Sequence, residues 1–153
     1  MDKKLQLKMA ELSDLGSWME LVEVVKHNFP GLDTDKEIND YKQVVIKNIN
    51  KNSAICVKHK EKVVGVLIFS YNQKCLSCMA VHPEYRQRGI GAAMVEEMLC
   101  LLPKGEDILV MTFREDDEKG IAPRALYKKF GFVEEELLID RNYPHQRFIL
   151  HRN

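Results

Sequence analysis

The stretch that decides the fold runs Leu76-Ser77-Cys78-Met79-Ala80-Val81-His82-Pro83-Glu84-Tyr85-Arg86-Gln87-Arg88-Gly89-Ile90-Gly91-Ala92. An apolar run ends at a proline, a short basic loop follows, and two glycines one residue apart open a second apolar segment. This order predicts a strand, a turn and the first turn of a helix. The N–H groups at a helix start lack partners within the helix, and the helix dipole is positive there. Because Arg86 and Arg88 add positive charge, the stretch predicts a site for a pyrophosphate group.

The overall composition limits the classes of protein to consider. The chain has 153 residues, and its 23 basic and 23 acidic residues cancel to a formal net charge of zero. This length favours one domain over residues 1–153. A neutral chain lacks the broad basic surface of a nucleic-acid-binding protein, so the local basic loop suits a small anionic ligand. No apolar run could cross a bilayer and no signal-peptide core opens the chain, which predicts a cytoplasmic protein without a membrane partner.

The cysteines carry no metal or disulfide pattern. There are four of them, Cys56, Cys75, Cys78 and Cys100, without the spacing of a small secreted domain. Cys75 and Cys78 spell C-x-x-C, but they fall in a predicted strand, where residues three apart point to opposite faces. No second C-x-x-C or close pair of histidines completes a zinc set. We therefore expect reduced, buried or half-buried thiols and no metal site.

The hydrophobic periodicity predicts the remaining elements. Strands are expected over residues 6–9, 54–58, 63–71, 75–81, 108–113, 132–140 and 147–151. A first helix is expected after a cap at Ser13-Asp14, and a second after the capping box Thr34-Asp35-Lys36-Glu37. Two more helices are expected over residues 89–102 and 122–130, and a hairpin turn around Asn142-Tyr143-Pro144.

The order of these elements predicts the fold class. The strands at 75–81 and 108–113 flank the helix from Gly89, and such a crossover connection joins parallel strands. The strands before it follow one another through short turns and are expected to be antiparallel. We predict an α/β (mixed α+β) domain with a central mixed, mostly antiparallel sheet of about seven strands and helices on both faces. Ligands in such sheets bind at the carboxyl ends of the parallel strands, where Gly89 and Gly91 lie.

Other phosphate-binding classes fit the glycines less well. The sequence has no G-x-x-x-x-G-K-S/T motif, which excludes a P-loop. A dinucleotide-binding fold needs a third glycine where Met94 stands, and an acidic residue at the end of the next strand, which is Thr112-Phe113-Arg114. Glycines that serve only tight helix–strand packing are the remaining alternative.

Two motifs resemble the GNAT-type N-acetyltransferase family. Arg86-Gln87-Arg88-Gly89-Ile90-Gly91 resembles its acetyl-CoA signature R/Q-x-x-G-x-G/A, and the preceding residues 76–83 are similar to its L-x-x-L-A-V-x-P strand. Met79 takes the place of the second leucine. Ala125-Leu126-Tyr127-Lys128-Lys129-Phe130-Gly131-Phe132 is similar to the family's A-x-x-Y-x-x-x-G-F segment. The resemblance covers about residues 54–150, with the elements in the family's order.

The resemblance implies acetyl-CoA as cosubstrate, held between two splayed parallel strands. The backbone of residues 87–92 would hold the pyrophosphate, and that of Met79 and Val81 would run along the pantetheine arm. An N–H group of that strand would polarise the thioester carbonyl. The implied cofactor-binding residues are Met79, Ala80, Val81, Arg86, Gln87, Arg88, Gly89, Ile90, Gly91, Ala92 and Tyr127.

The resemblance also implies direct attack of a neutral amine on the acetyl thioester. Tyr127 occupies the family's position for the proton donor to the leaving thiolate, and the alternative is a half-buried aromatic that faces the core. Several members of the family place a glutamate or histidine as base on the strand where Cys75 and Ser77 stand here. Ser77 is therefore the second candidate catalytic residue, through a bound water, with simple packing as the alternative. Glu115, Asp116 and His145 are further candidates for the base.

The expected function is transfer of an acetyl group to a primary amine, most simply that of a small molecule. A protein N-terminus or lysine is the alternative acceptor, and a non-catalytic acyl-CoA-binding module is the alternative class. Trp18, Phe29, Tyr41 and Tyr71 are candidates to line the acceptor site, or else belong to the core. Because members of the family are often dimers, a homodimer is also implied.

Overall fold

The computed structural model describes residues 1–152. They form a seven-stranded sheet in the order β1-β2-β3-β4-β5-β7-β6. The strands are β1 (Leu5–Met9), β2 (Ala54–His59), β3 (Lys62–Ser70), β4 (Cys75–Val81), β5 (Ile108–Phe113), β6 (Val133–Asp140) and β7 (Tyr143–Leu150). The α-helices are α1 (Leu15–Val25), α2 (Asp35–Asn50), α3 (Ile90–Leu101) and α4 (Ile121–Lys129). The predicted α/β fold class and the order of its elements are confirmed.

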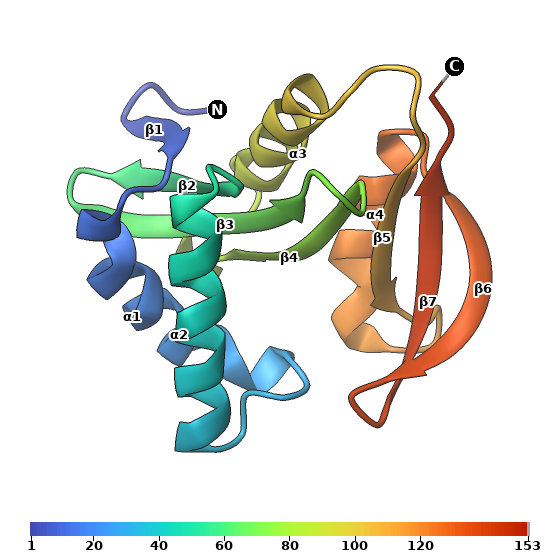
Figure 1. Cartoon of the computed structure of the whole chain (residues 1–153), viewed down its shortest axis with the longest axis horizontal. Coiled ribbons are helices and arrows are strands. Elements are labelled where there is room, and N and C mark those ends of the chain that lie inside the picture. The colour runs from blue at the N-terminus through green and yellow to red at the C-terminus, as the bar shows by residue number, and fades with distance from the viewer. Residues whose placement is uncertain (153) are drawn as a thin grey trace.

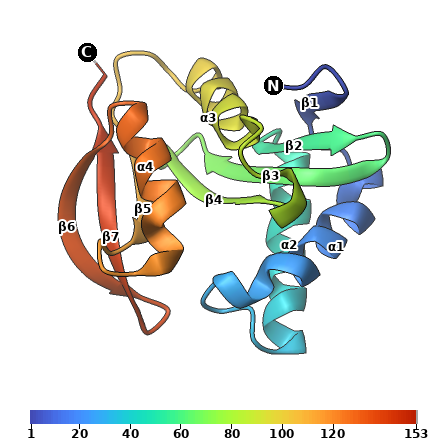
Figure 2. The same ribbon diagram turned by 180° about the vertical axis from the view of Figure 1, so that it is seen from behind.

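Helices cover both faces of the sheet, as predicted. Figure 1 shows α2 crossing in front of β3 with α1 beside it below the strand, and Figure 2 shows α3 above the strands and α4 in front of β5. Each face has its own core. Trp18 and Val45 are fully buried under α1 and α2, whereas Met94 and Phe148 are fully buried on the side of α3 and α4.

One pair of strands is parallel, and it is short. β4 and β5 pair only at Cys75 with Leu109 and at Leu76 with Val110. All the other neighbouring strands are antiparallel and pair over most of their length. Beyond Leu76 the two parallel strands therefore diverge, which confirms the predicted splayed pair (Figure 1).

A β-bulge interrupts β4 at Ser77. Ile68 of β3 pairs with Cys78 and Phe69 pairs with Leu76, so Ser77 between them has no partner. An extra residue in one strand reverses the alternation of its side chains. Leu76 and Met79, three residues apart, consequently both pack on the α3 side. The expectation that residues three apart in this strand face opposite sides was wrong. The bulge could not be predicted, because no sequence pattern indicates one within a short apolar run.

The C-terminal hairpin turns earlier than predicted. Its turn is Arg141-Asn142, with φ of 51° and 60°, as in the two-residue type I′ turn that suits hairpins. Pro144 and Tyr143 therefore belong to β7 rather than to the turn. The pairing of β5 with β7 reaches only Phe113 and His145. Pro144 lies just beyond it, so its missing N–H breaks no bond to β5.

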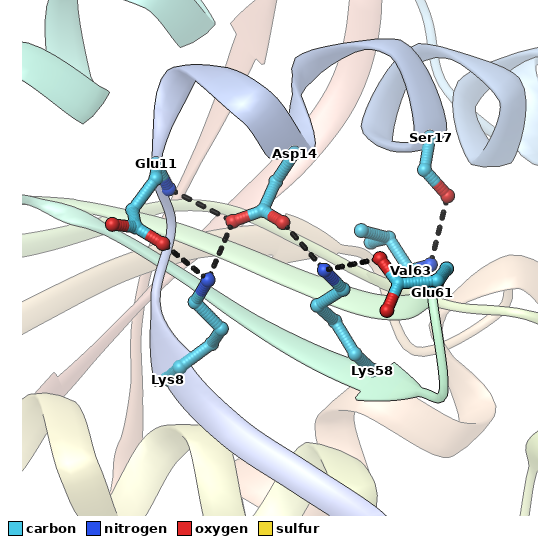
Figure 3. A network of polar contacts seen from close by, with 7 residues as sticks. All are labelled: Lys8, Glu11, Asp14, Ser17, Lys58, Glu61 and Val63. Carbon is cyan, nitrogen blue, oxygen red and sulfur yellow. Dashed lines mark hydrogen bonds and ion pairs between the residues drawn. The ribbon is translucent and has the colours of Figure 1, made fainter.

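The start of α1 also differs from the prediction. Asp14 does not cap the helix through its side chain, and a 3-10 turn at Leu12–Asp14 precedes α1. The Asp14 carboxylate is 2 % exposed and instead accepts a hydrogen bond from the Glu11 N–H at 2.9 Å. It also pairs with Lys58 of β2 at 2.8 Å and with Lys8 of β1 at 3.1 Å (Figure 3). This network ties α1 to the outer strands of the sheet.

The pKa of Asp14 is lowered from its ordinary value. Burial alone would raise the pKa, but the hydrogen bonds from Lys58, from the Glu11 N–H and from Lys8 together outweigh it. A carboxyl whose pKa is lower in the folded state stabilises the fold above its unfolded pKa of about 3.9. That stabilisation is lost as the pH falls through the folded value.

We expect Asp14→Asn to lower the free energy of unfolding by about 3 kcal/mol, because it leaves two lysines facing a buried neutral group. The variant should also lose part of the acid sensitivity of the wild type below about pH 4. Urea unfolding at pH 7 and pH 3.5 measures both effects. The matched control is Asp40→Asn, whose pair with Lys36 is exposed and should contribute less than about 0.5 kcal/mol. Equal losses in the two variants would contradict this account of the network.

Candidate functional site

The gap between β4 and β5 exposes one backbone edge of β4. The His82 N–H donates to the Val64 oxygen at 2.8 Å, so this pair is hydrogen-bonded across β3 and β4. Bonded pairs alternate along antiparallel strands, so Ala80 and Cys78 also direct their backbone groups to β3. Met79 and Val81 direct theirs the other way, into the gap. The strand therefore presents free N–H and C=O groups where β5 has moved away.

The N-terminus of α3 lies at the end of this edge. Gly89 is its N-cap residue with φ of 79°, and Gln87 before it has φ of 62°. The first hydrogen bond within the helix runs from the Ala93 N–H to the Gly89 oxygen, at 3.0 Å. The N–H groups of residues 90–92 thus have no partner in the helix. Arg86, Gln87, Arg88 and Gly89 are all exposed, so the loop and helix start are open to a ligand.

Tyr85 holds this loop in place, a role that the sequence did not reveal. Its hydroxyl lies 2.7 Å from Nδ1 of His59 on β2. The guanidinium of Arg88 stacks on the Tyr85 ring, 4.9 Å from its centre. His82 closes the 3-10 turn before the loop by accepting the Glu84 N–H at 3.1 Å. Tyr85 and His59 are 26 residues apart in the sequence, and no local pattern links them.

Helix α4 meets both α3 and β4 at the gap. A methyl group on Gly91 would lie 3.1 Å from Leu126 of α4 and 3.9 Å from the Met79 sulfur. A side chain at this position would require Leu126 to shift by a few tenths of an ångström, so glycine favours the close approach. The two sequence motifs, the strand with its glycine loop and the tyrosine helix, therefore converge at one place.

Tyr127 is buried, with 4 % of its surface exposed. Its ring packs against Phe132 and Phe148, 5.8 Å and 6.3 Å away between ring centres. Burial raises its pKa, and the charge of Cys78 adds to the effect. The hydroxyl therefore keeps its proton at neutral pH. The ring therefore packs in the core, as the alternative reading expected, while the role of its hydroxyl as a proton donor stays a prediction.

Ser77 is exposed at the bulge, and its hydroxyl lies 3.8 Å from the Cys75 sulfur. His145, the other candidate base, lies on β7 and stacks on Phe113 with 5.4 Å between ring centres. Its Nδ1 lies 2.8 Å from the Tyr143 oxygen. Ser77 thus lies on β4 itself, two residues before Met79, whereas His145 lies on β7, opposite Phe113 of β5.

The predicted acceptor-site residues divide into three kinds. Trp18 is fully buried in the core, and its indole N–H donates to the Tyr41 hydroxyl at 3.2 Å. Tyr41 in turn contacts the Cys78 sulfur at 3.5 Å, and both line a cavity together with Phe29. Tyr71 points elsewhere, since its hydroxyl donates to the Asn52 oxygen.

Arg124 of α4 is a buried charge that sequence reasoning missed. It is 5 % exposed and donates to the Phe113 oxygen, to Gln146 and to Glu134 at distances of 2.6 to 3.0 Å. Its guanidinium also covers the Phe148 ring at 4.8 Å. It anchors α4 to β5 and β7, and an arginine within a basic helix gives no sequence signal for such a role.

The four cysteines are free thiols. Among residues 1–152, no three His, Cys, Asp or Glu side chains gather so that they could hold a metal ion. Within the same range, no helix is both long enough and apolar enough to cross a membrane.

The fold is that of an α/β protein whose two parallel strands diverge after two paired positions. Known structures share this fold over nearly the whole chain. A GNAT-family acetyltransferase from Bacillus cereus superposes with a TM-score of 0.73 at 20 % identity, over 97 % of this chain and 98 % of its own. YncA of Salmonella typhimurium, solved with its cofactor acetyl-CoA, gives 0.72 at 10 % identity over 97 % and 94 %. The S. typhimurium acetyl transferase that modifies the N-terminal serine of ribosomal protein L7/L12 gives 0.67 at 14 %, over 99 % and 97 %.

The family is established by a sequence match. The acetyltransferase (GNAT) domain model matches residues 50–134, more than half of the chain. No curated protein matches the sequence. The chain belongs to the GNAT acetyltransferase family, whose members transfer acyl groups from acetyl-CoA. The resemblance of the two motifs is thereby confirmed.

We expect Gly89→Ala to weaken acetyl-CoA binding about tenfold or more, because a side chain at this positive φ shifts the loop and crowds the helix start. Gly105→Ala is the matched control. Gly105 also has a positive φ, of 86°, but it lies in the connection between α3 and β5, away from the start of α3. Both variants should lose about 1 kcal/mol of stability from backbone strain. Calorimetric titration with acetyl-CoA separates them, and equal affinities would exclude this helix start as the pyrophosphate site.

Proposed function

We propose that this chain transfers the acetyl group of acetyl-CoA to a primary amine of a small molecule, in a ternary complex. The observation that carries the proposal is the free backbone edge of Met79 and Val81, which ends at the α3 N-terminus and lies beside α4. An extended chain with an amide backbone can add to such an edge as a strand would. Its diphosphate end would then meet the helix start.

The residues present fit such a cosubstrate. The exposed loop of residues 86–89 and the free N–H groups of residues 90–92 suit a diphosphate, and Gly89 keeps side-chain atoms out of its way. In this proposal the cofactor-binding set is Met79, Val81, Arg86, Gln87, Arg88, Gly89, Ile90, Gly91, Ala92 and Tyr127. Ala80 was also expected to bind the cofactor, but its backbone groups are directed to β3. We therefore place it beside the binding edge rather than in the binding set.

Acetyl-CoA supplies the acetyl group as a thioester. An N–H group of the Met79–Val81 segment polarises the thioester carbonyl. The amine nitrogen forms a bond to the acetyl carbon, the carbon–sulfur bond breaks, and Tyr127 gives its proton to the departing sulfur. The proton lost by the amine returns to Tyr127 through solvent, so the products are the N-acetyl amine and the CoA thiol. Ser77 stays a candidate to hold a water on this route.

Contact between two loops favours a small acceptor. A methyl group on Gly31, in the connection between α1 and α2, would lie only 2.7 Å from the Arg141 guanidinium in the β6–β7 turn. The Arg141 side chain therefore spans between the two loops, which lie next to each other at the lower edge of the molecule in Figure 1. This contact leaves less room for a folded protein to approach the acetyl group than for a small molecule.

We further propose a single cytoplasmic domain over residues 1–153, without nucleic-acid partners. A homodimer is a second proposal, to be tested by sedimentation.

The test is release of free thiol from acetyl-CoA with a panel of small primary amines, compared with peptides that offer an N-terminal amine or a lysine. We expect turnover with small amines. Faster turnover with peptides at equal concentration would assign the protein alternative. Acetyl-CoA binding, seen as a raised melting temperature, without thiol release for any acceptor would assign the binding-module alternative.

We expect Tyr127→Phe to lower kcat by about tenfold or more, because the leaving thiolate loses its proton donor. The ring and its packing on Phe132 and Phe148 are kept, so the melting temperature and the acetyl-CoA Kd should change little. Tyr71→Phe removes a hydroxyl that bonds only to the Asn52 oxygen and serves as the control. Unchanged turnover in Tyr127→Phe would leave Tyr127 as a core aromatic alone.

A further inference from the structure

A small cavity lies on the α1–α2 side of β4, beside Met79 and Ala80. Its volume is about 30 Å³, roughly twice what a single water needs. Residues from α1, from the α1–α2 connection, from α2 and from β4 form its walls, chiefly Val25, Phe29, Leu32, Tyr41 and Cys78. Because the backbone of Met79 faces the gap, the cavity lies next to the proposed position of the thioester carbonyl, on the face away from α3 and α4. A chain of about two or three carbon atoms fits a space of this size.

The cavity is apolar and carries no charge on its walls. Its polar side-chain atoms are the Tyr41 hydroxyl and the Cys78 thiol, which lie 3.5 Å apart and satisfy one another. Tyr41 also accepts the Trp18 indole N–H. Burial raises the pKa of Tyr41 and that of Cys78. Within the described chain, therefore, no wall residue of this cavity is ionised at neutral pH, and none can take a proton from an amine.

The titratable groups that act on Cys78 do not supply a base either. The charge of Arg141 in the β6–β7 turn opposes the rise in the pKa of Cys78, and Cys78 contributes to the raised pKa of Tyr127. His145 stacks on Phe113 one strand beyond β5 and does not line the cavity. Low polarity and a nearby cation both disfavour a charged ammonium group. An amine at this place is most stable in its neutral form.

We propose that the acceptor is a weakly basic primary amine of the α-amino type, which arrives already neutral and places a short, unbranched apolar group in this cavity. An α-amino group has a pKa of about 7.7–8.0, against about 10.4 for a lysine-type amine. Solvent alone therefore keeps an appreciable fraction of the first kind neutral near pH 7.5. This inference rests on the proposed function and narrows its acceptor.

The experiment compares four amines by thiol release from acetyl-CoA. They are 2-aminobutanamide, with an ethyl side chain; glycinamide, with none; valinamide, with a branched one; and propylamine, which is strongly basic. At pH 7.5 we expect kcat/KM for 2-aminobutanamide to exceed that for propylamine by about tenfold or more, and to exceed the other two amides by about threefold or more. The pH at which kcat/KM levels off should follow the pKa of each amine.

Several outcomes would overturn the inference. One inflection shared by all amines would reveal a base in the protein, and equal turnover of propylamine at pH 7.5 would remove the preference for weak bases. A preference for valinamide would exclude the narrow cavity. These results overturn this inference alone, whereas no thiol release with any amine would overturn the proposed function as well.

Phe29→Ala widens the cavity and tests its role directly. We expect the ratio of kcat/KM for valinamide to that for 2-aminobutanamide to rise about fivefold. A ratio of two substrates does not depend on the fraction of folded enzyme. Leu32→Ala repeats the test at a second wall position, and Val44→Ala, an exposed position on α2, is the matched control. An unchanged ratio in both cavity variants would overturn the assignment of the cavity to the acceptor.

Discussion

The divergence of β4 from β5 is the constraint on which the rest of the structure depends. Two parallel strands that pair at only two positions leave backbone N–H and C=O groups on both edges without partners from the sheet. Unpaired backbone groups in a protein interior are costly, so such an opening persists only where water or a ligand satisfies them. The Ser77 bulge lies at the point of divergence, and bulges bend the strand that carries them. The divergence of the two strands and the bulge together open the sheet at this point.

The neighbouring elements supply or position the groups that surround this opening. The glycine-opened helix supplies N–H groups at one end, and Tyr127 lies in the helix that covers the β5 side. Arg124 fixes that helix by hydrogen bonds to the Phe113 backbone and to Gln146 and Glu134. On the opposite face the Asp14 network fixes α1, which forms one wall of the cavity beside Cys78. Charged groups in this chain are thus buried where they position helices, whereas the walls of the cavity are uncharged.

Local sequence signals predicted the helices and strands. Glycine, proline and periodic apolar residues act over a few positions, and they correctly gave the order of the elements along the chain, the helix after Gly89 and the Tyr127 helix. Three features depend on contacts between distant residues and could not be predicted: the bulge at Ser77, the Tyr85–His59 pair, and the Trp18–Tyr41–Cys78 chain. Pro144 misled for the opposite reason. A proline close to Asn142 strongly indicates a turn. Pro144 nevertheless fits within β7, because the pairing with β5 ends one residue away, at His145.

The short pairing of β4 with β5 also divides the sheet into two blocks, β1 to β4 and β5 with β7 and β6. Within the sheet, only the register of Cys75 and Leu76 with Leu109 and Val110 joins them. A cosubstrate lying in the groove would bond to one block through Met79 and Val81 and pack on the other through α4. It would therefore act as an eighth strand that completes the sheet. How firmly the two blocks are held relative to each other would then depend on whether the cosubstrate is bound.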